Sequence, residues 1–166
     1  MQNVSFEEFY RGHYALVLRF AERRIDPERS LEICSDCFTI AWKDYDEQSP
    51  PSITWLYKTA HHLIGNAYRS RDREQKLMDA LERQAAVEGS NETRIDVTAA
   101  MERLSRKDAE VLRLTYWEEL SAAEVAEVVG STEQAAWKRI SRAKQSLRLA
   151  LSSASGPVGK EDANVG

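Results

Sequence analysis

Two cysteines three positions apart are the side chains in this sequence best suited to covalent or metal chemistry. Cys34 and Cys37 form a C-x-x-C motif, which can serve as a redox pair or as half of a zinc site. His61 and His62 could add two ligands, but neighbouring residues of one helix point about 100° apart, which is a poor chelating geometry. Both cysteines fall on the apolar side of a predicted helix, so we predict buried, inert thiols. A thiol or zinc enzyme built on this motif stays open as an alternative.

No other set of residues in the chain suggests a reaction. The sequence contains no Ser/His/Asp arrangement, no P-loop and no pair of carboxylates that points to catalysis. We therefore predict no catalytic residues, no metal site and no cofactor. We therefore expect the function to lie in binding surfaces.

Charge is distributed unevenly along the 166 residues. The net charge is −4, yet residues 51–76 carry +3 and residues 132–151 carry +4 in an otherwise acidic chain. Phosphate binding depends on local potential, because fields decay over about 8 Å at physiological salt. Two basic segments therefore indicate two separate contacts with nucleic acid. The overall acidity indicates weak DNA binding by the free protein.

The second basic segment belongs to the stretch 120–151, which has the pattern of a helix-turn-helix. Ser121 and Glu124 form a capping box at the start of a short helix, and Gly130 can take the positive φ that ends it. The Ser-Thr pair after Gly130 can cap the longer basic helix that follows. The second helix of such a motif enters the DNA major groove.

The two faces of this second helix differ in chemistry. One stripe is apolar and predicts the packed side: Ala136, Ile140, Ala143 and Leu147. The opposite face carries side chains that bond base edges and phosphates: Gln134, Lys138, Ser141 and Gln145, flanked by Trp137 and Arg142. For this helix taken alone, an ordinary solvated basic face is the alternative.

The first basic segment predicts a long helix from Ile53 to about Lys76. Its buried stripe comprises Leu56, Ala60, Leu63, Ile64 and Ala67. The other side combines cations, rings and an amide: Lys58, His61, His62, Gly65 and Arg69, with Trp55, Asn66 and Arg73 at its edges. This mixture suits single-stranded DNA, in which bases stack on rings and phosphates meet cations. The alternative is that Trp55 and Tyr57 are core aromatics and the histidines are solvated.

The remaining periodicities predict an all-α protein of two small helical domains joined by a flexible linker. Further helices are expected at about 5–24, 27–45, 97–104 and 106–116, the last with an apolar set of Ala109, Val111, Leu112, Leu114 and Tyr116. We expect a first domain over 1–76, a linker over 77–96 that is partly helical up to Val87, a helix-turn-helix domain over 97–151 and a disordered tail over 152–166. No signal-peptide core and no stretch near 18 apolar residues is found, so we expect a cytoplasmic protein without membrane insertion.

The helix expected at 27–45 has one broad apolar side, which contains both cysteines, and one polar side. The apolar set is Ile33, Cys34, Cys37, Phe38, Ile40 and Ala41. The opposite set is Glu32, Ser35, Asp36, Thr39 and Lys43. The acidic, hydroxylated character of this face suits a partner protein, and a plain solvated face is the alternative.

Taken in order, these elements resemble the extracytoplasmic-function (ECF) sigma factors of bacterial RNA polymerase, a group of the sigma-70 superfamily, over roughly residues 5–150. Ile33-Cys-Ser-Asp-Cys-Phe38 with Ala41-Trp42 is similar to the family's polymerase-binding helix. The −10 helix of the family is matched by Trp55-Leu-Tyr57, Ala60-His-His-Leu63 and Asn66 to Arg69. Its C-terminal domain is matched by Met101 to Leu104, Glu110 to Leu112, Leu120-Ser121, Glu124 to Ala126 and Lys138 to Lys144.

The resemblance implies a detachable specificity subunit of polymerase that performs no chemistry itself. The clamp and flap regions of the polymerase core would be partners, with the clamp binding Glu32, Ser35, Asp36, Thr39 and Trp42. The 44–52 loop and the helix after it would capture the unpaired −10 strand, with Trp55, Lys58, His61, His62, Asn66, Arg69, Arg71 and Arg73. The −35 duplex would meet Gln134, Trp137, Lys138, Arg139, Ser141 and Arg142. An anti-sigma factor is a further implied partner.

One of these assignments depends on the family alone, and another departs from the family's pattern. Arg139 lies close to the buried stripe, so its phosphate contact is implied only by the resemblance. Trp137 occupies a position where a basic residue is common in the family.

A stand-alone helix-turn-helix regulator with an N-terminal sensing domain is the alternative function, and it predicts a dimer on a palindromic site.

Overall fold

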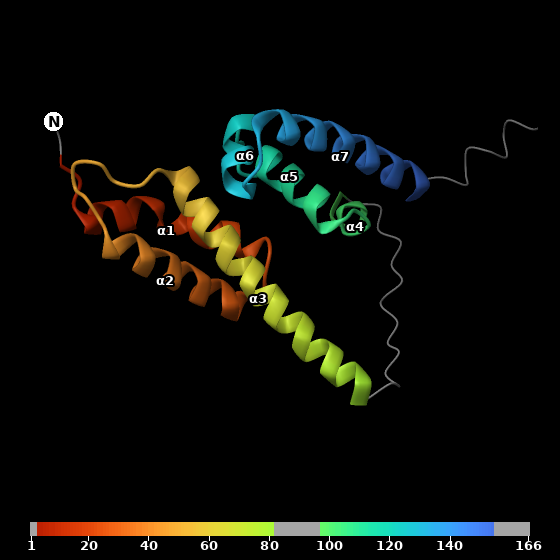
Figure 1. Ribbon diagram of the computed structural model, residues 1–166, viewed down its shortest axis with the longest axis horizontal. Coiled ribbons are helices and arrows are strands. Elements are labelled where there is room, and N and C mark those ends of the chain that lie inside the picture. Colours follow the sequence, from red (N-terminus) through yellow and green to blue (C-terminus); the bar gives the residue numbers. More distant parts are fainter. Residues whose placement is uncertain (1–2, 82–96, 155–166) are drawn as a thin grey trace, which may run out of the picture. The chain divides into compact units, whose positions relative to one another are not determined.

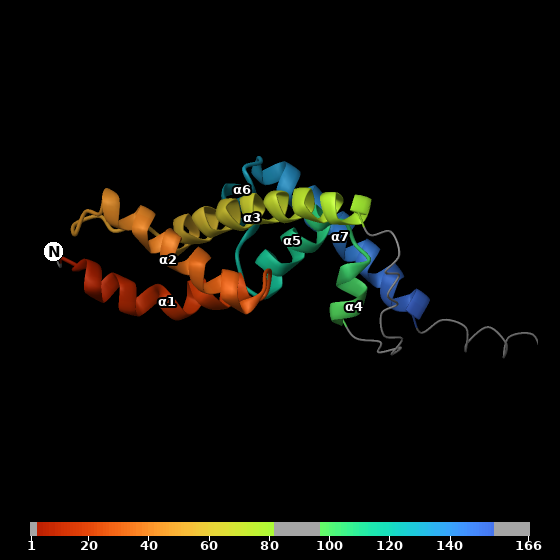
Figure 2. The ribbon, with the colours of Figure 1, turned by 90° about the horizontal axis from the view of Figure 1, so that it is seen from below.

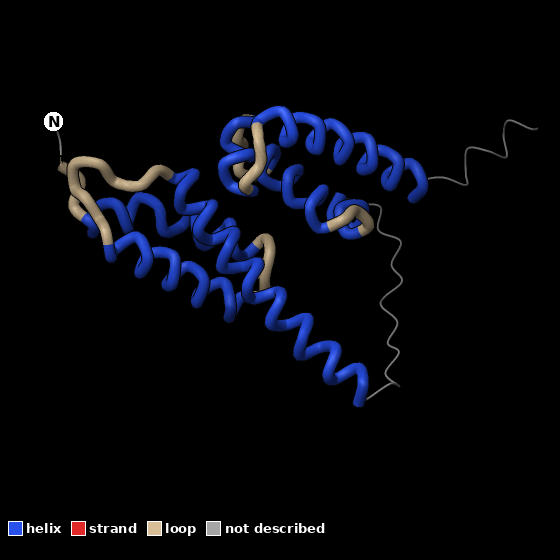
Figure 3. Tube along the Cα trace, in the orientation of Figure 1, coloured by secondary structure: helices blue, strands red, loops and turns tan. Residues whose placement is uncertain are grey.

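The computed structural model describes residues 3–81 and 97–154, and these residues form seven helices and no strand (Figures 1 and 3). This confirms the predicted all-α class. The chain divides into two compact units. Helices α1–α3 and helices α4–α7 are described in turn.

Three helices that pack on one another make up the first unit: α1 (Phe6–Glu22), α2 (Pro27–Lys43) and α3 (Ile53–Leu81) (Figures 1 and 2). A polar side chain caps the N-terminus of each of these helices. The Ser5 hydroxyl oxygen accepts from the Glu8 N–H at 3.1 Å, and the Asp26 carboxylate accepts from the Arg29 N–H at 3.1 Å. The Ser52 hydroxyl oxygen accepts from the Trp55 N–H at 3.0 Å.

The core of this unit is built largely from the apolar sides that periodicity predicts, although Leu63 and Ala67 of the expected buried stripe are only half-buried. Its buried members include Phe9, Val17, Phe20, Ile33, Cys34, Cys37, Phe38, Leu56, Tyr57, Ala60 and Ile64. Phe20 of α1 stacks on Tyr57 of α3, with ring centroids 4.8 Å apart and planes inclined by 15°. Tyr57 is therefore a core aromatic. Ile40, which we expected on the apolar side of α2, is 37% exposed, so its burial was predicted wrongly.

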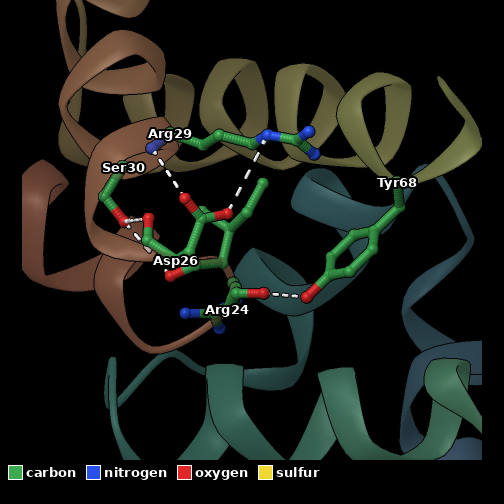
Figure 4. Close-up of polar contacts among 6 residues, drawn as sticks. Arg24, Asp26, Arg29, Ser30 and Tyr68 are labelled. Carbon is green, nitrogen blue, oxygen red and sulfur yellow. Dashed lines mark hydrogen bonds and ion pairs between the residues drawn. The ribbon is translucent and has the colours of Figure 1, made fainter. Parts of the chain in front are cut away.

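The corner between α1 and α2 is fastened to α3 by polar contacts (Figure 4). The Tyr68 hydroxyl donates to the carbonyl of Arg24, and the Ser30 hydroxyl donates to the carbonyl of Asp26 at 2.9 Å. Asp26 also forms an ion pair with Arg29, with the carboxylate oxygen 3.9 Å from Nε. Of these contacts, the Tyr68 bond joins the corner to α3, while the Asp26 carbonyl also accepts from the Ser30 N–H at 2.9 Å.

The second unit contains α4 (Val97–Glu102), α5 (Arg106–Tyr116), the part of α6 (Ala122–Val129) up to Ala126, and α7 (Glu133–Ala154). Helices α4 and α5 pack on α7. The core of this unit comprises Ala100, Met101, Ala109, Val111, Leu112, Leu114, Leu120, Val125, Ala126, Ala136, Ile140 and Ala143. Tyr116 was expected in this apolar set but is 56% exposed. It lies in the last turn of α5, and the Lys144 ammonium sits 5.6 Å from its ring centroid.

The helix-turn-helix forms by the local signals in its sequence. Ser121 and Glu124 make a reciprocal capping box, with bonds of 3.2 and 2.9 Å. Gly130 ends α6 at φ 77°, and the Thr132 hydroxyl oxygen accepts from the Ala135 N–H at 3.0 Å at the start of α7. A second left-handed residue, Glu119 at φ 55°, precedes the motif.

Two expected boundaries differ from the structure. Helix α3 runs to Leu81, beyond the end expected at about Lys76 and into the part of the linker that we expected to be partly helical, because residues 77–81 are mostly strong helix formers. Helix α7 continues through residues 152–154, which we expected in the tail, since no glycine or proline interrupts it there. The rest of the expected linker, 82–96, and of the expected tail, 155–166, lies outside the described residues.

Candidate nucleic-acid interface

Helix α7 presents one continuous polar face opposite its buried stripe. Gln134, Trp137, Lys138, Ser141 and Arg142 are all exposed. Trp137 is 60% exposed, although it is the largest apolar side chain in the helix, and it lines a shallow hollow with Glu133, Gln134 and Lys138. The structure thus brings these five predicted residues together on the side of the helix-turn-helix that is free of packing.

Arg139 is the exception among the predicted −35 residues. Its Nη1 lies 3.1 Å from a carboxylate oxygen of Asp108, which is the third residue of α5. Asp108 in turn donates its N–H to the Ser105 hydroxyl oxygen at 3.1 Å. The Arg139 guanidinium is therefore paired with a residue of its own unit, and Asp108 was not among the sequence-predicted site residues.

Helix α3 carries the second predicted set along its outer side. His62, Asn66, Arg69, Arg71 and Arg73 are exposed. Trp55, Lys58 and His61 are half-buried. The Arg69 guanidinium donates to the side-chain oxygen of Asn66, one turn earlier. The imidazole rings of His61 and His62 have centroids 6.0 Å apart with planes inclined by 69°, so they face different directions. The result is a basic surface with rings at its N-terminal end.

The predicted polymerase-binding residues lie on the outward side of α2. Glu32, Ser35, Asp36, Thr39 and Trp42 are all exposed. Three of them, Ser35, Thr39 and Trp42, also line a hollow of about 300 Å³ between α1 and α2, whose other walls are Phe6, Tyr10, Tyr14, Leu31 and Phe38. The edge of Phe6 meets the Trp42 ring with centroids 4.8 Å apart. An exposed aromatic hollow beside acidic and hydroxyl groups is a surface typical of protein interfaces.

Both cysteines lie on the inward side of α2 and are fully buried as free thiols. Their sulfurs are 3.9 Å from the Tyr14 carbonyl and 3.5 Å from the Leu56 carbonyl. Burial raises the pKa of Cys34 to about 11 and that of Cys37 to about 12, so neither is a thiolate at neutral pH. Within the described segments, no group of three or more His, Cys, Asp or Glu side chains could hold a metal ion. This geometry does not support thiol or zinc chemistry.

Sequence reasoning also missed Tyr45, in the loop between α2 and α3. Its hydroxyl donates to the carbonyl of Val4 at 2.8 Å. The sequence signal was weak, since the loop was recognised only by its acidic residues and its two prolines.

No helix in the described part of the chain is long and apolar enough to cross a membrane.

A helix-turn-helix with an exposed polar face, in a chain that carries a second basic helix face, is typical of DNA-binding proteins. Two family models match the chain: sigma-70 region 2 over residues 9–74 and sigma-70 region 4 over residues 94–147. The chain is 32% identical to the ECF RNA polymerase sigma factor SigD of Mycobacterium tuberculosis over 152 residues, with 80% of this chain and 70% of SigD covered. It therefore belongs to the ECF sigma factors of RNA polymerase.

Other relatives agree with this family. The RNA polymerase sigma factor YlaC of Bacillus subtilis is 32% identical over 143 residues, covering 76% of this chain and 80% of YlaC. The match to the Bacillus subtilis sigma factor SigZ is 29% identical and covers 64% of this chain but only 61% of SigZ. Proteins of this family are transcription initiation factors that bind DNA and are not enzymes.

Solved structures share the fold. The sigma factor RpoE of Bartonella quintana, in complex with the anti-sigma factor NepR, matches with a TM-score of 0.67 at 21% identity, covering 88% of this chain and 96% of RpoE. CnrH, in complex with the cytosolic domain of CnrY, matches with a TM-score of 0.64 at 24% identity, covering 89% of this chain and 88% of CnrH.

Proposed function

We propose that this sigma factor directs RNA polymerase core to promoters through two DNA contacts, a −35 duplex contact by α7 and a −10 strand contact by α3 and the 44–52 loop. The observation that carries the proposal is the exposed face of α7, where a helix-turn-helix displays Gln134, Trp137, Lys138, Ser141 and Arg142. A tryptophan exposed between polar side chains adds nothing to the packing of a structural helix. In a helix that enters the major groove, the same side chain is buried when DNA binds.

At the −35 element, the N-terminal half of α7 enters the major groove. Gln134, Lys138 and Ser141 supply donors and acceptors for base edges, Trp137 supplies an apolar contact, and Arg142 meets phosphate. Arg139 has a different role from the one that the resemblance implies. Since Asp108 holds it at 3.1 Å, it orients α7 on α5 and contributes little net charge to the DNA.

At the −10 element, the non-template strand follows the outer side of α3. The cations Lys58, Arg69, Arg71 and Arg73 meet phosphates, and Trp55, His61, His62 and Asn66 meet bases by stacking and hydrogen bonding. The 44–52 loop receives one unpaired base. The support for this contact is the joint exposure of basic and hydrogen-bonding groups on this side of α3.

The outward face of α2 docks on the polymerase clamp, and the flap is the further contact on the core. Glu32, Ser35 and Asp36 supply polar contacts, and Trp42 supplies an apolar anchor of the kind that dominates protein interfaces. The support is the exposed aromatic hollow between α1 and α2. The site of action is the cytoplasm, where polymerase is found.

An anti-sigma factor is the second protein partner that we propose. RpoE of Bartonella quintana is bound to the anti-sigma factor NepR, and CnrH is bound to the cytosolic domain of CnrY. This chain shares the fold of both. Its exposed apolar side chains, including Trp42 and Trp137, offer surface for such a protein to cover.

Run-off transcription with core polymerase, this protein and a genomic promoter library tests the proposal. Transcripts should start at promoters that share one −35 and one −10 motif, and none should appear without the protein. A mobility-shift assay with the free protein should show weak binding to the same duplexes. Tight binding by a dimer of the free protein to a palindrome contradicts the proposal and favours a stand-alone regulator.

A further inference from the structure

The loop between α2 and α3 is fastened to the residues that precede the first helix. The N–H of Val4 donates to the carbonyl of Glu47 at 3.1 Å, and the carbonyl of Val4 accepts from the Tyr45 hydroxyl at 2.8 Å. The same hydroxyl lies 3.4 Å from the carbonyl of Ser5. Val4 is thus held through both of its backbone polar groups by two residues of one loop.

The ring of Tyr45 is fixed as well as its hydroxyl. Its centroid lies 5.2 Å from that of Phe6, with planes at 86°, and 5.2 Å from that of Phe9. Burial, followed by the charge of Glu47, raises the pKa of the phenol, which therefore remains a hydrogen-bond donor at neutral pH. Tyr45 joins the loop to both α1 and the segment before it.

Beyond Tyr45, the loop presents polar side chains from a compact turn. The Asp46 carboxylate accepts from the N–H of Gln48 at 2.9 Å, and the Asp46 carbonyl accepts from the N–H of Ser49 at 3.1 Å. Residues 46–49 are all exposed. The far end of the loop is held by Ser52, which caps α3. The exposed acceptors are therefore displayed by a turn that is anchored on both sides.

We propose that the segment around Val4 is a strap that holds the 44–52 loop in the conformation that receives an unpaired −10 base, with Tyr45 as the positioning residue. The proposal rests on the function proposed above and adds a determinant of base selectivity. A loop must be ordered before its acceptors can discriminate between bases, and ordering in advance removes that cost from each binding event.

The matched pair of variants is Tyr45→Phe and Tyr68→Phe. Each removes one tyrosine hydroxyl that donates to a backbone carbonyl in the same unit, and each leaves the ring in place. Only the first touches the loop, since Tyr68 binds the carbonyl of Arg24 at the corner between α1 and α2 (Figure 4). Similar thermal stabilities of the two variants show that any difference arises from the loop.

Two measurements test whether the strap orders the loop and whether that order affects base preference. Amide hydrogen exchange of residues 46–49 in the free protein should be about fivefold faster in Tyr45→Phe than in Tyr68→Phe, the factor expected for one lost hydrogen bond. Run-off transcription over promoters with each of the four bases at every −10 position should show a base preference about fivefold flatter in Tyr45→Phe. Preference at the −35 element should stay unchanged in both variants.

Three outcomes are decisive. Unchanged loop exchange in Tyr45→Phe overturns the strap, and faster exchange with an unchanged −10 preference shows that the strap has no part in selectivity. Failure of the wild-type protein to start transcription with core polymerase refutes the proposed function instead, and the exchange data from the free protein still decide whether the strap exists. Val4→Pro, which removes the N–H that Glu47 accepts, should reproduce the effects of Tyr45→Phe from the other side of the contact.

Discussion

Two tryptophans of nearly equal exposure, on different units of the chain, allow the two proposed interfaces to be separated. Trp137 on α7 is 60% exposed and Trp42 on α2 is 59% exposed. Trp137→Ala should alter −35 preference and leave the affinity for core polymerase unchanged. Trp42→Ala should lower the affinity for core and leave promoter preference unchanged.

The magnitude for Trp137 follows from its exposed area. A tryptophan side chain contributes roughly 250 Å² of surface, so 60% exposure leaves roughly 150 Å² for a partner. If half of that area is covered in the groove, about 25 cal/mol/Å² gives about 2 kcal/mol. The affinity of the holoenzyme for its preferred −35 sequence should then fall roughly 30-fold. This lies within the range of about 1–3 kcal/mol for a specific base contact.

The assay is competitive binding of holoenzyme to a promoter library randomised at −35, with a parallel fluorescence titration of core polymerase. Leu149→Ala is the control for loss of apolar surface on the same helix, because Leu149 is 65% exposed but lies beyond the predicted contact residues. Melting curves of all three variants should agree within a few degrees. The reasoning is refuted if Trp137→Ala weakens core binding as much as Trp42→Ala does, or if it leaves −35 preference intact.

Three further predictions concern stability. Gly130→Ala should lower the free energy of unfolding in urea by about 1–2 kcal/mol, because φ is 77° while a Cβ meets nothing within 4 Å, and an unchanged midpoint would contradict this. A double-mutant cycle on Asp108 and Arg139 should give a coupling of about 0.5–1 kcal/mol, because the side chains are only 24% and 44% exposed, and a coupling near zero would show that the pair does not hold α7 on α5. Burial raises the folded-state pKa of Cys34 to about 11 and that of Cys37 to about 12, above the ordinary 9.0. The contribution of the two thiols to the free energy of unfolding should therefore be complete below pH 9 and should be lost as the pH rises toward these values. This fall in the free energy of unfolding should reach about 1.4 kcal/mol per pH unit for each thiol. Urea titrations across pH 8–11 should show the fall in the wild-type protein and not in the variant with both cysteines replaced by alanine.

Local signals in the sequence predicted the helix-turn-helix well. The capping box of Ser121 and Glu124 and the left-handed Gly130 each depend on residues within four positions of one another. The same holds for Asp26, which caps α2. Such signals act before tertiary packing and can be read directly from the chain.

Burial was predicted less well, because periodicity gives the direction of an apolar face but not the width that a neighbouring helix covers. Cys34 and Cys37 face the centre of α2's packed side and are buried as expected. Ile40 lies at the edge of that side and Tyr116 at the end of α5, and both remain exposed. The burial of residues at such edges depends on where the neighbouring helices lie.

The two side chains that sequence reasoning missed are both defined by distant contacts. Tyr45 binds a carbonyl 41 positions away, and Asp108 pairs with a guanidinium 31 positions away. Neither residue belongs to a periodic pattern that could reveal its partner. The exposed faces of α2, α3 and α7 could be predicted, but the residues that hold them in place required coordinates.

The pairing of Arg139 with Asp108 has a consequence for counterions. A cation that already has a carboxylate as its counterion releases no salt ion when it approaches a phosphate. Of the three cations that the sequence assigns to the −35 face, this leaves Lys138 and Arg142 to displace ions, and each contributes about −0.9 to the slope of log affinity against log salt. That slope of about −2 costs only about tenfold in −35 affinity between 50 and 200 mM salt. On the proposed function, the affinity of the −35 contact should therefore depend on salt less steeply than that of a contact made by three unpaired cations, and a larger share of the ionic-strength dependence of promoter binding should fall to α3 and to the polymerase.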